Sequence, residues 1–168
     1  MMSEWAKAKG EVKREFNDME KLIDGYNYKD PKHTEKTDKK LRKLVADEIN
    51  KTRDFLFPMI EAAYLDQDMK SAGPLDEVMQ WLDIYLLELG LKMNWSEVAD
   101  YKDYMRLIKF DVTLIRNAMK LTEILEDMQD SVLNGKGAAS VPRKSTQIKK
   151  YIMDLLTVFK RRRHALGG

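Results

Sequence analysis

The segment from Asn94 to Asn134 has the longest unbroken helical pattern in the chain, and it constrains the fold more than any other feature. About 40 residues at ~1.5 Å each would form a rod of roughly 60 Å. Asn94 and Glu97 have the spacing of a capping box, and Asn134-Gly135 supplies a stop. Its apolar residues recur at alternating three- and four-residue steps, which places them on one helix face: Val98, Tyr101, Met105, Ile108, Val112, Ile115 and Met119.

Four further amphipathic segments indicate an all-α protein. The chain has 168 residues, enough for one domain, and its four Pro and eight Gly stand mostly between periodic segments. We expect helices at about 3–27, 35–67, 74–89, 95–134 and 143–166, with a flexible connector at 135–142. The sequence thus predicts a single domain over 1–168, an elongated antiparallel bundle of five helices around the long fourth helix of about 40 residues.

Two polar residues interrupt the predicted apolar faces. Asp111 lies among the apolar residues of the long helix, and a buried carboxylate needs a cation, a hydroxyl or a backbone donor. We favour a structural pair with an Arg, Lys or Tyr of another helix, and the alternative is a ligand or an acid/base group. Thr52 lies on the second apolar face, where its hydroxyl can bond Glu48 or its own backbone, or pair with Asp111.

Charge is distributed unevenly along the chain, although the net charge is only +2. Residues 141–168 contain eight basic residues and one acid, and the other 140 residues sum to about −5. Residues 66–100 hold eight acids against Lys70 and Lys92. This asymmetry predicts either head-to-tail contact or an anionic partner.

The last helix is the candidate binding element, because Lys and Arg on one helix suit phosphate contacts. Its alternatives are contact with the acidic region of the same or a neighbouring chain, and an anionic membrane surface. Tyr151 and Phe159 belong to the predicted core, so they are not expected to stack on bases. The helix would recognise phosphates rather than the base sequence. The predicted nucleic-acid-binding residues are Arg143, Lys144, Lys149, Lys150, Lys160, Arg161, Arg162 and Arg163.

Apolar residues on the outer side of the third predicted helix are candidates for a protein interface. Single exposed apolar residues are ordinary, but a group of them favours partner binding or self-association. The candidates are Trp81, Ile84, Leu87 and Leu91.

Residue patterns of known catalytic sites are missing. The chain has no Cys and only two histidines, His33 and His164, so no nucleophile with a supporting base is predicted. We predict no catalytic residue, no metal site and no cofactor. No run approaches the ~18 apolar residues of a membrane span, and the charged N-terminal stretch favours a cytoplasmic location.

These patterns predict a non-enzymatic interaction or assembly protein whose basic C-terminal helix contacts nucleic acid or another polyanion through phosphate. The first alternative is a pure protein–protein adaptor or a homo-oligomeric structural protein. The second alternative is an all-α nucleotide hydrolase that holds a metal on carboxylates. Such an enzyme would place carboxylates inward on two facing helices, whereas the paired carboxylates found at helical spacing lie on or next to the solvated face of the long helix: Glu123, Glu126 and Asp127.

Overall fold

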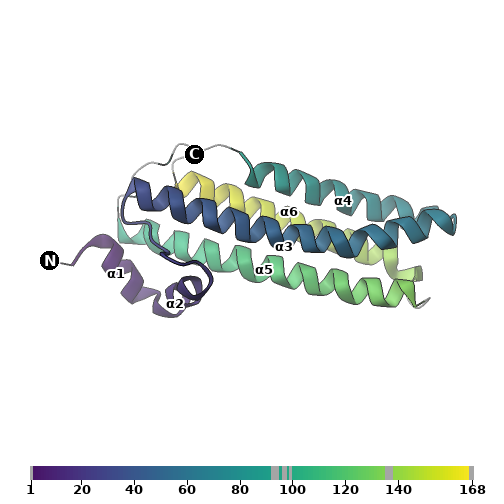
Figure 1. The fold of residues 1–168 in the computed structure, drawn as a ribbon, viewed down its shortest axis with the longest axis horizontal. Helices are drawn as coiled ribbons and strands as arrows, with labels where there is room; N and C mark the ends of the chain where they lie inside the picture. The colour runs from purple at the N-terminus through teal and green to yellow at the C-terminus, as the bar shows by residue number, and fades with distance from the viewer. Residues whose placement is uncertain (1, 92–94, 96–97, 99, 135–137, 167–168) are drawn as a thin grey trace. The chain divides into compact units, whose positions relative to one another are not determined.

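The computed structural model describes residues 2–91, 95, 98, 100–134 and 138–166, and every regular element in these ranges is helical (Figure 1). The all-α class is therefore confirmed, with six α-helices in these ranges where five were expected. The helices are α1 (Glu4–Glu11), α2 (Lys13–Leu22), α3 (Pro31–Leu65), α4 (Met69–Leu89), α5 (Tyr101–Leu133) and α6 (Val141–Ala165), with a short 3-10 helix at Ala138–Ser140.

The range 3–27, predicted as one helix, contains two. The backbone of Val12 has φ −121° and ψ 45°, which separates α1 from α2. Beyond α2, Gly25 adopts a φ of 73°, a conformation that glycine enters without steric cost, and turns the chain into irregular residues 26–28. The apolar residues that recur every seven positions in this range are nevertheless buried, although the helix is broken between them: Trp5, Val12, Met19 and Tyr26.

Helices α3 and α4 begin earlier than predicted because an aspartate caps each of them. The Asp30 carboxylate accepts the backbone N–H of His33 at 2.9 Å, and Pro31 suits the first helical position. The Asp68 carboxylate accepts the N–H of Ser71 at 3.3 Å, and Pro74 then lies inside α4. Residues 31–34 and 69–73, which were expected to precede these helices, are thus helical.

The long predicted helix is also shorter than expected. Trp95 and Val98 are not helical, and the predicted capping box at 94 and 97 lies outside the described residues. Helix α5 starts at Tyr101, where Asp100 accepts the backbone N–H of Asp103 at 3.0 Å. With 33 residues, α5 is shorter than α3, which has 35 and continues through its internal proline.

The chain divides into two compact units. Unit 1 comprises residues 1–45, 91–116 and 157–168, and unit 2 comprises residues 46–90 and 117–156. Helices α3, α5 and α6 contribute residues to both units.

Unit 2 is a four-helix arrangement of the end of α3, α4, the end of α5 and the start of α6. Arg53 of α3 pairs with Asp83 of α4 at 3.1 Å. Gln129 of α5 donates to the carbonyl of Phe55 in α3 at 3.0 Å. Helices α3 and α4 are joined by three residues, so they run antiparallel, as in other helical bundles with short loops.

In unit 1, helices α1 and α2 and residues 23–30 pack against three helix segments. These segments are the start of α3, the start of α5 and the end of α6. Its core contains a cluster of aromatic rings in edge-to-face and tilted contact, a geometry that adds stability beyond area burial. The ring of Trp5 lies 5.2 Å from that of Tyr104 and 6.0 Å from that of Tyr28. The cluster consists of Trp5, Phe16, Tyr26, Tyr28 and Tyr104.

Candidate polyanion-binding surface

One arginine of the predicted binding set is enclosed in the core of unit 1. The side chain of Arg162 is 0% exposed. Its Nε donates to Asp111, its Nη1 to Asp38, and its Nη2 to the hydroxyl of Tyr28 at 2.8 Å. All three edges of the guanidinium are therefore used within the chain. The prediction that Arg162 contacts phosphate is wrong, because a buried and fully paired guanidinium offers nothing to a ligand.

A second arginine completes this polar network. Asp38 also accepts from Nε of Arg42 at 2.9 Å and from the indole N–H of Trp95 at 2.9 Å. The Arg42 guanidinium lies 5.0 Å from the ring centre of Phe159 and donates to the carbonyl of Leu91 at 2.9 Å. Two carboxylates thus face two guanidiniums, so the network is neutral as a whole and is structural in character.

Asp111 has partners of the kind that its position on the apolar face suggests, an arginine and two tyrosines of other segments. It is fully buried, and it accepts from the hydroxyl of Tyr26 at 2.6 Å and from that of Tyr28. Burial raises the pKa of Asp111, although Arg162 and the two hydroxyls oppose that shift. Burial also raises the pKa of both tyrosines well above the usual 10.0, and Asp111 adds to the effect.

These tyrosines predict a specific loss of stability in alkali. The unfolded chain releases both protons near pH ~10, whereas the folded chain keeps them, so the free energy of unfolding falls as pH rises further. Two protons give a slope of about −2.7 kcal/mol per pH unit. The double variant Tyr26→Phe/Tyr28→Phe lacks both hydroxyls, so its free energy of unfolding should not show this alkaline slope. Urea unfolding of both proteins from about pH 9 to 11 measures the difference. Equal alkaline slopes in both proteins would contradict it.

The hydroxyl of Thr52 has its partners within unit 2. Its hydroxyl lies 3.2 Å from the Glu48 carbonyl and 3.0 Å from the hydroxyl of Thr122 in α5. The bond to Glu48 is one of those the sequence suggested, while the suggested pairing with Asp111 is wrong. This polar contact between α3 and α5 satisfies a fully buried hydroxyl.

The two units carry opposite charge. Unit 1 holds 21 Lys and Arg against 13 Asp and Glu, a formal charge of +8, and unit 2 holds nine against 15, a formal charge of −6. The neutral buried network contributes nothing to the +8, which therefore belongs to the remaining, outer residues of unit 1. The basic character is thus a property of one unit rather than of α6 as a whole.

The predicted binding residues of α6 are divided between the two units. Four of them, Arg143, Lys144, Lys149 and Lys150, lie in acidic unit 2. There Lys149 pairs with Glu77 of α4 at 2.9 Å, which is the intrachain contact considered as an alternative from the sequence. In unit 1, Lys160 and Arg161 are exposed, and Arg163 is half-buried with a contact inside the chain.

Arg161 shares an open hollow with residues of α5. The hollow has a volume of about 570 Å³. Arg106 and Phe110 line its α5 side, and Arg161 and His164 line its α6 side. Asp103 pairs with Arg106 at 3.6 Å, but both side chains are well exposed, and such pairs contribute little. We call this site the basic hollow; it is lined by Asp103, Arg106, Phe110, Arg161, His164 and Ala165.

Further cations continue along α5 next to the basic hollow. They recur at three-, four- and seven-residue steps, which places them on one helix face. A second open hollow, of about 310 Å³, joins Arg14 of α2 to Lys109 and Arg116 of α5, with Glu15 and Asp18 on its α2 side. The exposed cations of α5 and α6 in unit 1 are here called the basic surface: Lys102, Arg106, Lys109, Arg116, Lys160 and Arg161.

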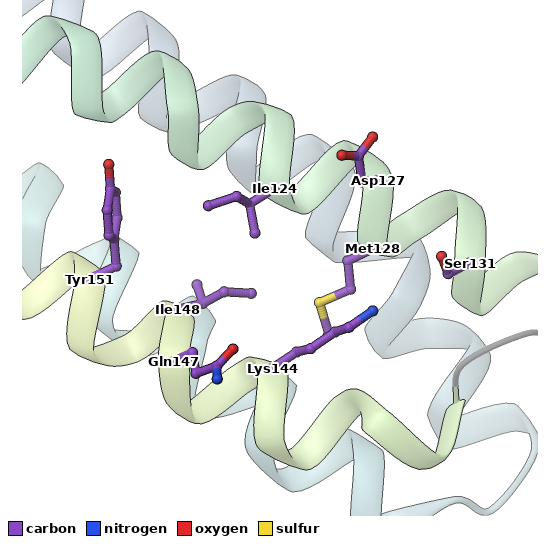
Figure 2. A pocket seen from close by; sticks show the side chains of 8 residues that line it. All are labelled: Ile124, Asp127, Met128, Ser131, Lys144, Gln147, Ile148 and Tyr151. Carbon is purple, nitrogen blue, oxygen red and sulfur yellow. The ribbon is translucent and has the colours of Figure 1, made fainter.

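Unit 2 has a hollow of a different kind between α5 and α6, with a volume of about 390 Å³. Figure 2 shows Ile124 and Met128 of α5 facing Ile148 of α6, so its walls are largely apolar. Tyr151 lines one end, and its buried hydroxyl has no hydrogen-bond partner in the described part of the chain. Burial raises the pKa of this hydroxyl.

The apolar interface candidates differ in exposure. Leu87 is 71% exposed and Ile84 40%, both on α4 in unit 2, whereas Trp81 is half-buried. Leu91 is 48% exposed and belongs to unit 1. Their role in protein contact stays a prediction.

Comparison with known proteins gives no match: no protein-family model, no curated protein and no solved structure matches the chain. Among the described residues, no group of three or more His, Asp or Glu is placed to hold a metal ion. No helix in the same ranges combines the length and apolar character that a bilayer span requires.

Proposed function

We propose that this chain is a non-enzymatic helical protein that binds nucleic acid or a related polyanion through the basic surface of unit 1. The observation that supports this proposal is the concentration of charge, +8 in unit 1 against −6 in unit 2. Lysine and arginine that approach phosphates release condensed counterions, and this release supplies most sequence-independent affinity.

The side chains of the basic surface suit phosphate recognition. Arg106 and Arg161 enter the same hollow from different helices, and each planar guanidinium can bind phosphate oxygens in a bidentate manner. The surrounding lysines act as point charges along α5. Unit 2 carries a net negative charge, so its own surface does not favour the same ligand.

The protein adaptor is the second candidate function, favoured by the exposed apolar residues Ile84 and Leu87 on α4. Such residues suit a helix-face contact with another protein or with a second copy. The two functions are compatible, because the apolar residues lie on acidic unit 2 and the cations on unit 1.

No observation favours the nucleotide hydrolase. Its candidate carboxylates Glu123, Glu126 and Asp127 are all exposed on α5, where charged residues are ordinarily solvated.

Titration of the protein with a fluorescent single-stranded oligonucleotide, at about 50 and about 200 mM salt, tests the proposal. If the six cations of the basic surface each contact a phosphate, the affinity should fall roughly 300-fold between the two conditions. Fluorescence anisotropy measures both affinities. Absence of binding at the lower salt, or an affinity that does not change with salt, would contradict the proposal.

A further inference from the structure

Phe110 differs from the other aromatic side chains of unit 1. The rings of the aromatic cluster and of Phe159 are buried, whereas Phe110 is half-buried in the wall of the basic hollow. The half-buried rings of Trp95 and Tyr101 each have a lysine above them, Lys39 and Lys7. Phe110 has no ring or cation contact within the described part of the chain, and it lines the basic hollow, where a ligand can reach it.

The surroundings of Phe110 are those of a site for a flat, anionic group. Arg106 precedes it by one helical turn on α5, and Arg161 and His164 lie across the hollow on α6. Sequence-tolerant binding of single strands combines a cationic groove with aromatic side chains on which bases stack. A peptide segment of Asp and Glu would use the arginines but has no flat group to stack on the phenyl ring.

We infer that the basic hollow holds one unpaired nucleotide, with its base on Phe110 and its phosphate on Arg106 and Arg161. This inference rests on the proposed function and narrows the ligand to single-stranded nucleic acid. In a duplex the bases are stacked on each other inside the helix, so only the phosphates would reach the hollow. The volume of about 570 Å³ lies within the range of sites that hold small organic ligands.

The test compares the wild type with Phe110→Ala on a single-stranded oligothymidylate of ~12 nucleotides and on a duplex of equal length. Loss of one stacked base should weaken single-strand binding by roughly 5- to 150-fold, while the duplex affinity and the salt dependence stay unchanged. Phe57→Ala is the matched control, because Phe57 is 61% exposed and lies on acidic unit 2. It should leave both affinities unchanged.

A second measurement does not depend on any variant. An abasic oligonucleotide has the same phosphates as oligothymidylate but no bases. The wild type should bind this abasic strand more weakly than oligothymidylate, and the ratio of the two affinities should equal the loss of affinity that Phe110→Ala causes. Equal binding of the two strands, or equal losses for single strand and duplex in Phe110→Ala, would overturn the inference. In that case salt-dependent binding would still support the proposed function. Failure of every strand to bind at about 50 mM salt would overturn both.

Discussion

Replacement of Arg162 by alanine is expected to lower the free energy of unfolding by about 3–5 kcal/mol. The variant would leave Asp111 in the core without its cation, with only the hydroxyls of Tyr26 and Tyr28 as donors. Asp38 would keep Arg42 and Trp95, so most of the loss arises at Asp111. A buried carboxylate without a counter-charge costs far more than the loss of an ordinary surface contact.

Urea unfolding at neutral pH, followed by circular dichroism, measures this effect. Arg161→Ala is the matched control, since it removes the same side chain one residue earlier, where it is exposed. We expect the control to change stability by no more than about 0.5 kcal/mol. A loss below about 1 kcal/mol in Arg162→Ala would mean that the buried network does not hold unit 1 together.

The second large effect concerns binding. The triple variant Arg106→Ala/Lys160→Ala/Arg161→Ala should bind a single-stranded oligonucleotide roughly 100-fold more weakly at about 0.1 M salt, because each lost phosphate contact removes about 0.7 from the salt slope. Arg162 is kept, since its loss would destabilise unit 1 and confuse binding with folding. All three replaced side chains are exposed.

Anisotropy titrations at several salt concentrations measure both the affinity and its slope. The slope of the triple variant should be smaller than that of the wild type by about 2. An unchanged slope, with the thermal unfolding of the variant also unchanged, would show that these residues do not contact phosphate.

The position of Arg162 was predictable from the sequence in principle. It follows Phe159 by three residues and precedes Leu166 by four, so it continues the apolar face of α6. Both neighbours are buried, as that phase requires. By charge alone, the four cations of residues 160–163 are all expected on the binding surface. Their helical phase, in contrast, places Arg162 on the buried face.

The identity of the partners in this network could not come from the sequence. Asp111 and Arg162 are 51 positions apart, and Tyr28 and Arg162 are 134 positions apart, so only tertiary packing brings them together. The apolar face showed that Asp111 needed a donor, but any Arg, Lys or Tyr of the chain satisfied that requirement.

Helix existence was more predictable than helix ends. Asp30, Asp68 and Asp100 each accept a backbone N–H three residues later, and these local bonds fix the true starts of α3, α4 and α5. Proline marks neither start reliably, since Pro31 is the first residue of α3 whereas Pro74 lies inside α4.

The charge of the two units and the setting of Phe110 also escaped prediction. Three of the four boundaries between the units fall inside the continuous helices α3, α5 and α6, so no linker marks them in the sequence and the charge of each unit could not be counted from it. Phe110 fits neither the apolar face nor the charged face of α5 clearly, and its role depends on which residues of α6 lie across from it.

The most direct test of this account compares two triple variants that remove three cations each. One is Arg106→Ala/Lys160→Ala/Arg161→Ala in unit 1, and the other is Arg143→Ala/Lys144→Ala/Lys150→Ala in unit 2. Titrated side by side with one oligonucleotide at about 0.1 M salt, only the unit 1 variant should lose roughly 100-fold in affinity. An equal loss in the unit 2 variant, or a larger one, would contradict the assignment of binding to the basic surface of unit 1.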